Sequence, residues 1–227
     1  MKILAFETSA KAASAALLRD GILLGESYQN TGLTHSQTLL VMAQDLLKQC
    51  GLTVGDVTHV AVAEGPGSFT GIRIGVAAAK GLSWGGELPL CGVSTLEAMA
   101  LGLGAYEGIV CPVMDARRSQ VYNALFRAEG GKLTRIVPDR AISLEDLGKE
   151  LSALPGPVFL VGDGSYVTHK ALPATVLPPE HRLHQRAAGV ALAAEGKIAS
   201  GESCDGAALT PNYLRLSQAE RERLERQ

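Results

Sequence analysis

The sequence contains few aromatic residues and no excess of charge of either sign. Phe, Trp and Tyr make up 4% of the 227 residues, whereas hydrophobic residues make up 46%. A core built from this composition must be mainly aliphatic, with much Ala and Gly. Lys and Arg number 21 against 23 Asp and Glu, a formal net charge of -2. Because proteins dedicated to binding nucleic acid are usually basic, this balance disfavours independent binding to RNA or DNA.

Paired cysteines and long apolar runs are absent as well. The cysteines Cys50, Cys91, Cys111 and Cys204 are scattered without a C-x-x-C pair, which is typical of buried thiols in a reducing compartment and not of a zinc site or disulfide framework. No apolar run approaches the ~20 residues that span a bilayer. The acidic Glu7 comes too early for a signal peptide. We therefore expect a soluble, cytoplasmic protein without a membrane contact.

The most distinctive segment is the glycine-rich stretch at residues 65–75. It follows an apolar run that predicts a buried strand at 59–63 and leads into a helix over about 70–83. Gly71, Gly75 and Ala79 recur every four residues, so one side of this helix is almost bare backbone. Small residues at this spacing let another element approach closely. That element is either the chain's own sheet or a helix of another subunit.

The predicted strands and helices form two similar series. The first is strands at 2–6, 13–18 and 22–28, a helix at 36–50, a strand at 59–63 and a helix at 70–83. The second is strands at 109–114, 121–127 and 133–137, a helix at 144–154 and a strand at 158–161. This order predicts an α/β fold. We place the boundary at 102–105, which gives an N-terminal lobe over 1–104 and a smaller C-terminal lobe over 105–227.

The turn after the first strand is a candidate phosphate site. Glu7, Thr8 and Ser9 could contact phosphate or magnesium, or they could simply close a turn. Ser68 and Arg73, in the glycine-rich stretch, are weaker phosphate candidates. The stretch matches neither the dinucleotide nor the P-loop spacing.

A second polar turn follows the strand at 109–114. Arg117 and Arg118 come shortly after Asp115, and arginines can hold a phosphate or a partner's carboxylate bidentately. An internal Asp–Arg pair that stiffens the turn is the alternative. Local spacing assembles no Ser-His-Asp or Cys-His set and no metal-binding set, so we assign neither a catalytic residue nor a metal ligand.

Several of these segments together resemble one family. They are residues 3–9 with 13–18, Thr34-His35-Ser36 before Leu39-Leu40, residues 65–75, residues 115–118 with Val121-Tyr122, and Pro211 with Tyr213-Leu214-Arg215. The chain is similar over nearly its whole length to the TsaB (YeaZ) family of bacterial tRNA threonylcarbamoyladenosine biosynthesis proteins. Glu7 departs from the pattern, because the family usually carries Asp there.

The resemblance implies an actin-like ATPase (ASKHA) fold of two βββαβα-type lobes, the second reduced. It also implies an inactive paralogue of TsaD, the subunit that transfers threonylcarbamoyl to adenosine 37 of tRNAs reading ANN codons. The expected role is a non-catalytic scaffold that pairs with a TsaD-type subunit, is joined by a TsaE-type ATPase, and forms a homodimer when alone. We expect contact with tRNA only through the complex and no cofactor of its own, with ATP or ADP at the interface of the complex.

Pairing in this family uses the two helices of the N-terminal lobe. The implied partner interface is Leu39, Leu40, Ala43, Leu47, Thr70, Gly71, Ile74, Gly75, Ala78, Ala79 and Leu82. The stripe of small residues agrees with that interface. The alternative function is an actin-fold ATP-binding enzyme, either an ATPase or a phosphotransferase with Gly162-Asp163-Gly164 as its second phosphate loop, or a metallopeptidase-like protein.

Overall fold

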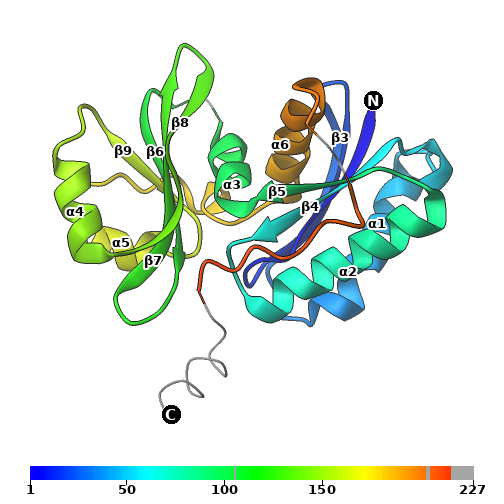
Figure 1. Ribbon diagram of the computed structural model, residues 1–227, viewed down its shortest axis with the longest axis horizontal. Coiled ribbons are helices and arrows are strands. Elements are labelled where there is room, and N and C mark those ends of the chain that lie inside the picture. The colour runs from blue at the N-terminus through cyan, green and yellow to red at the C-terminus, as the bar shows by residue number, and fades with distance from the viewer. Residues whose placement is uncertain (105, 203–204, 216–227) are drawn as a thin grey trace, which may run out of the picture.

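The computed structural model describes residues 1–104, 106–202 and 205–215, which form two lobes with one β-sheet each (Figure 1). The strands of the first lobe are β1 (Lys2–Glu7), β2 (Ala13–Arg19), β3 (Ile22–Gln29), β4 (His59–Gly65) and β5 (Leu90–Ser94). Their order is β3-β2-β1-β4-β5, with β1, β2 and β3 antiparallel and β1, β4 and β5 parallel. β1 is buried along most of its length, as expected for a strand covered on both faces.

Helices cover both faces of this first sheet (Figure 1). They are α1 (His35–Gln49), α2 (Phe69–Gly86), α3 (Thr95–Leu103) and α6 (Ala187–Ala199), with a short 3-10 helix η1 (Val54–Asp56) after α1. Leu4 and Phe6 of β1 pack toward α1 and α2. Ile3 and Ala5, which alternate with them, pack toward α6. The two-residue period of the strand thus divides the core into two halves.

The second lobe repeats the strand arrangement on a smaller scale. Its elements are β6 (Gly108–Asp115), β7 (Gln120–Glu129), β8 (Lys132–Ser143), α4 (Leu144–Ser152), β9 (Val158–Val161), α5 (Ser165–Ala171) and the 3-10 helix η2 (Glu180–Arg182). The sheet order is β8-β7-β6-β9, with β6 parallel to β9 and antiparallel to β7. The βββαβα order is therefore present twice, which confirms the predicted α/β fold with a reduced second lobe.

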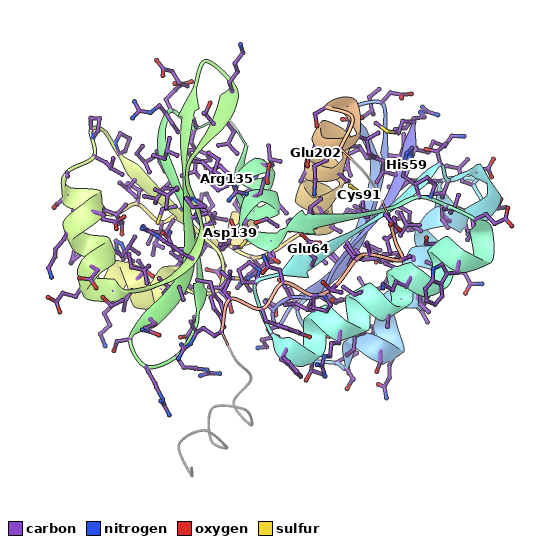
Figure 2. All side chains as sticks on the ribbon, in the orientation of Figure 1. His59, Glu64, Cys91, Arg135, Asp139 and Glu202 are labelled. Atoms are coloured by element: carbon purple, nitrogen blue, oxygen red, sulfur yellow. The ribbon has the colours of Figure 1, made fainter. Side chains whose placement is uncertain are left out.

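The lobes meet at α3 and at a pair of charged residues. Leu96, Met99 and Leu103 of α3 pack on the second sheet together with Phe126. Beside this cluster, Arg135 forms an ion pair of 2.8 Å with Glu97 of α3. Asp139 of β8 accepts a hydrogen bond of 2.5 Å from Ser94. Figure 2 labels Arg135 and Asp139 at this junction.

The predicted lobe boundary is wrong for the C-terminal part of the chain. Helix α6 lies within the predicted second lobe, 105–227, yet its residues Val190 and Ala194 pack against the first sheet. Leu209 is also part of the first lobe's core. The second lobe thus ends before α6, and the chain returns to the first lobe.

Candidate functional site

An apolar groove of about 610 Å³ runs along α1, η1 and α2. Its lining is Leu4, Leu40, Ala43, Gln44, Leu47, Lys48, Gly51, Leu52, Thr53, Val54 and Leu82. Leu40 is 49% exposed although it lies in the middle of α1. Val54, in the same groove, is exposed as well. Outside the groove lining, Val41 of α1 and Trp84 of α2 are also exposed, Trp84 at 66%. The groove and the two helices that border it thus present large apolar side chains to solvent.

The predicted interface residues divide between the outer and inner sides of the two helices. Leu40 and Thr70 are exposed, and Ile74, Ala78 and Leu82 are half-buried. The buried members are Leu39, Ala43, Leu47, Gly71, Gly75 and Ala79. For Leu39, Gly71, Gly75 and Ala79 the prediction of a partner-contacting surface is wrong, because these residues belong to the lobe's own core and do not line the groove. Ala43 and Leu47 are buried but also line the groove, so contact of these two residues with a partner stays a prediction.

The stripe of small residues serves the chain's own fold. A Cβ on Gly71 would lie 2.1 Å from the carbonyl oxygen of Thr8, and one on Gly75 would lie 2.4 Å from the Thr8 hydroxyl. The Thr8 hydroxyl donates a 2.8 Å hydrogen bond to the carbonyl of Gly71. The absent side chains therefore allow α2 to approach the end of β1. Of the two interpretations of the stripe, packing on the chain's own sheet is the correct one.

Sequence reasoning missed several exposed apolar residues on α1, η1 and α2 and in the segment just before α1. Leu33, Val41, Val54 and Trp84 are all exposed and were not predicted as interface residues. Val41 follows Leu40 directly and lies outside the apolar stripe of α1 that faces the core. An apolar residue that departs from the helical periodicity in this way is a signal that could have identified Val41 as an exposed residue.

A polar cleft of about 580 Å³ lies between the two lobes, at the C-terminal ends of β1 and β6. Its lining is Ser9, Ala10, Lys11, Pro66, Gly67, Ser68, Phe69, Met114, Asp115, Ala116, Arg117, Tyr122, Asp163, Asn212, Tyr213, Leu214 and Arg215. The turn after β6 in the second lobe corresponds to the turn after β1 in the first lobe. Each turn joins a central strand to its antiparallel neighbour. Asp163, in the loop 162–164 that the alternative function would use as a second phosphate loop, also lines the cleft.

Of the first phosphate candidates, Glu7, Thr8 and Ser9, only Ser9 lines this cleft. Glu7 is fully buried and does not line it. One Glu7 carboxylate oxygen accepts a 2.5 Å hydrogen bond from the Ser9 amide, and the other has no partner among the described residues. Burial raises the pKa of Glu7 to about 7, against hydrogen bonds from Ser9 that lower it. A phosphate or magnesium role in the cleft is therefore wrong for Glu7 and for the equally buried Thr8. Ser9 lines the cleft, but its hydroxyl is buried.

Ser68 and Arg73 have structural partners. The Ser68 hydroxyl accepts a 3.2 Å hydrogen bond from the Gly71 amide and so caps α2. The Arg73 guanidinium lies 3.7 Å from the centre of the Phe69 ring, and its Nε donates a 2.8 Å hydrogen bond to the Tyr213 hydroxyl. Of these two candidates only Ser68 lines the cleft.

Arg117 and Arg118 lie at the turn between β6 and β7. Both have positive φ angles, +66° and +55°. The Asp115 carboxylate accepts a 2.7 Å hydrogen bond from the Arg117 amide, and its ion pair with the Arg117 guanidinium is long, 3.9 Å. The internal Asp–Arg contact is therefore present. The Arg117 side chain is nonetheless 85% exposed at the edge of the cleft, so contact of this turn with RNA or a partner stays a prediction.

Two further findings concern metals and membranes. Within residues 1–104, 106–202 and 205–215, no three His, Cys, Asp or Glu side chains are grouped so that they could hold a metal ion. In the same part of the chain, no helix combines the length and the apolar character needed to cross a bilayer.

Two βββαβα lobes around a cleft define a protein of the actin-like ATPase fold. Component A of (R)-2-hydroxyglutaryl-CoA dehydratase from Acidaminococcus fermentans shares the fold with a TM-score of 0.52, at 13% identity, over 88% of this chain and 99% of that one. YeaZ from Pseudomonas aeruginosa is much more similar, with a TM-score of 0.78 and 28% identity over 94% of this chain and 99% of that one.

Sequence relatives define the family within this fold. The tRNA threonylcarbamoyladenosine biosynthesis protein TsaB of Bacillus subtilis is 34% identical over 233 residues, covering 100% of both chains. The family model described as TsaD, tRNA N6-adenosine threonylcarbamoyltransferase, matches residues 29–222. The chain belongs to the TsaB family, which is related to TsaD.

Proposed function

We propose that this chain is a non-catalytic subunit in the biosynthesis of threonylcarbamoyladenosine in tRNA. It pairs with a TsaD-type catalytic paralogue, which transfers threonylcarbamoyl to adenosine 37 of tRNAs reading ANN codons, and a TsaE-type ATPase joins the pair. Its contribution is to hold the paralogue in its competent conformation, a shift of population and not chemistry of its own. Alone, the chain forms a homodimer through the same surface.

The apolar groove along α1, η1 and α2 is the observation that carries this proposal. Monomeric proteins rarely leave a large apolar patch exposed, and within this groove Leu40 and Val54 are exposed to solvent. Leu40 and Leu82 bring the two helices into one surface that a partner's helices can cover. The similarity over the full length to TsaB of Bacillus subtilis supports the assignment to this pathway.

The test places one charge in the groove. Leu40→Asp should weaken pairing with the TsaD-type paralogue by at least about thirtyfold, because truncating or charging a residue at the centre of an interface costs about 2 kcal/mol or more. Size-exclusion chromatography with light scattering measures pairing, and threonylcarbamoylation of tRNA in the mixture of the three proteins measures the consequence. Both should fall together.

Val167→Asp is the matched control, because Val167 of α5 has a similar exposure of 42% but lies on the second lobe. It should leave pairing and modification unchanged. Full pairing by Leu40→Asp would move the interface elsewhere, and tRNA modification that proceeds without this chain would contradict the scaffold role.

The alternative of an ATP-binding enzyme has less support. The acidic residue expected to act through magnesium, Glu7, is sealed from the cleft, so the residues present do not fit a nucleotide held with a metal at that position. Titration of the isolated chain with ATP in a calorimeter should give no heat of binding at micromolar concentration. A nucleotide held in the assembled complex would bind only after the paralogue is added.

A further inference from the structure

The end of the described chain crosses from one lobe to the other. Residues 209–215, here called the C-terminal strap, run from the first lobe's core past the start of α2 to the turn after β6 (Figure 1). Four of its residues, Asn212 to Arg215, form one wall of the interlobe cleft. The strap has no helix or strand of its own, so side-chain and backbone contacts alone hold it in place.

The first lobe is shaped to receive the strap. Leu209 packs over Gly92 of β5, where an added Cβ would lie 2.1 Å from the leucine Cδ1. The Asn212 amide donates a 2.7 Å hydrogen bond to the carbonyl of Glu64. Gly65, with a φ of +127°, leaves room for the strap, because a Cβ there would lie 2.3 Å from the Asn212 carbonyl oxygen.

An aromatic contact anchors the middle of the strap to α2. The Tyr213 ring stacks on Phe69 with centroids 4.8 Å apart and an interplanar angle of 28°. Arg73 lies over the Phe69 ring and donates a hydrogen bond to the Tyr213 hydroxyl. Stacking and the cation–π contact favour the same position of Tyr213.

The strap reaches the second lobe through Arg215. Its guanidinium donates a 2.6 Å hydrogen bond to the carbonyl of Ala116, in the turn after β6. Contacts between the lobes away from the strap include the α3 cluster, on which Ala10 of the turn after β1 also packs, the Arg135–Glu97 ion pair and the Ser94–Asp139 hydrogen bond. Arg215 therefore connects the lobes at the cleft. Helix α3 connects them at the junction beside Arg135 and Asp139, which Figure 2 labels.

We propose that the C-terminal strap is an interlobe latch. With Tyr213 and Arg215 docked, the strap fixes the width of the cleft. With them released, the second lobe turns about the junction at α3 and the cleft widens, while each lobe keeps its own core. This device does not depend on the proposed function.

Hydrogen exchange on the full chain, read by mass spectrometry, tests the latch. In Arg215→Ala and Tyr213→Ala, the amides of 212–215 and of the turn at 114–120 should exchange about tenfold faster, as expected from the loss of one charge-assisted hydrogen bond or one stacked ring. Helix α4 and β9, away from the cleft, should exchange as in the wild type. Tyr213→Phe keeps the ring and should show a smaller effect, and Arg127→Ala, an exposed arginine on β7, should show none.

A distance between the lobes separates a latch from a segment that merely docks. Spin labels at Gln37→Cys on α1 and Glu145→Cys on α4, in a background with Cys50→Ser and Cys204→Ser that keeps the buried Cys91 and Cys111, should give a longer and broader distance distribution when Arg215→Ala is added. Unchanged distances would overturn the proposal even if the strap itself exchanged faster. Faster exchange throughout both lobes would also overturn it, because the strap would then stabilise the fold generally.

Discussion

Glu7 has an ionisable carboxyl group that is fully buried from solvent. Its pKa is about 7 in the folded protein, against 4.5 for the free side chain, mainly because burial disfavours the charged form. The folded state therefore keeps a proton that the unfolded chain releases between these values. The stabilising effect of that proton is complete below pH 4.5 and is lost as the pH rises through 7.

Glu7→Gln should remove this pH dependence, because the amide can accept the Ser9 hydrogen bond without a charge. At pH 8 the variant should be more stable than the wild type by up to about 3 kcal/mol, and at pH 4 the difference should be small. Urea unfolding across this range measures it. Glu145→Gln, at an exposed position of α4, should leave the pH profile as it is. Parallel profiles for Glu7→Gln and the wild type would show that Glu7 ionises normally.

Glycines of α2 offer a second test within a single helix. Gly71→Ala should destabilise the protein by about 1–3 kcal/mol, because the added Cβ meets the Thr8 backbone. Gly81→Ala should stabilise it by up to about 1 kcal/mol, since a Cβ there meets no atom within 4 Å. Thermal or urea unfolding distinguishes the two. Equal effects of the two substitutions would mean that α2 does not rely on the close approach to β1.

The same glycines show what the sequence can and cannot predict at this scale. The spacing of Gly71, Gly75 and Ala79 predicts a close contact, and a close contact exists. The sequence could not reveal its partner, because Thr8 lies 63 residues away from Gly71 in the chain. Small residues at this spacing fit a neighbouring subunit and the end of a strand equally well.

At the scale of single elements, apolar periodicity predicted most strands and helices, and α5 is an instructive failure. The buried residues of α5 are Ser165 and Thr168. With polar side chains on its inner side, the helix has no apolar pattern to detect. The preceding residues 162–164 form a turn, and nothing in the sequence pattern indicated that a helix follows it.

The start of α2 can be tested through its cap. Ser68→Ala should cost about 1 kcal/mol, because the Gly71 amide loses its side-chain acceptor. Ser68→Asp should retain most of the stability, since aspartate caps helices as well as serine does and favours the positive end of the helix dipole. Chemical denaturation of the two variants measures the difference. Equal losses in both would mean that Ser68 acts through its packing in the cleft and not as a cap.

At the scale of the whole molecule, the sequence predicted two lobes but not how the chain divides between them. The return of α6 to the first lobe depends on contacts between residues far apart in sequence, such as the two hydrogen bonds that the Arg186 guanidinium donates to one carboxylate oxygen of Glu26, 160 residues away. An Ala-rich helix can pack on either sheet, so composition could not assign α6 to its lobe.

The position of α6 leads to a prediction about fragments. A fragment of residues 1–104, the predicted N-terminal lobe, lacks α6, which supplies most of the helical cover on the Ile3 and Ala5 side of the sheet, and should not unfold cooperatively. The same fragment joined by a flexible linker to residues 184–215 regains α6 and the strap and should show a sigmoidal urea transition. Circular dichroism and binding of a hydrophobic dye distinguish the two. Both fragments expose the outer side of α3 equally, so a difference between them reports on α6 and the strap. Cooperative unfolding of the shorter fragment would show that β1 to α3 form a complete core without them.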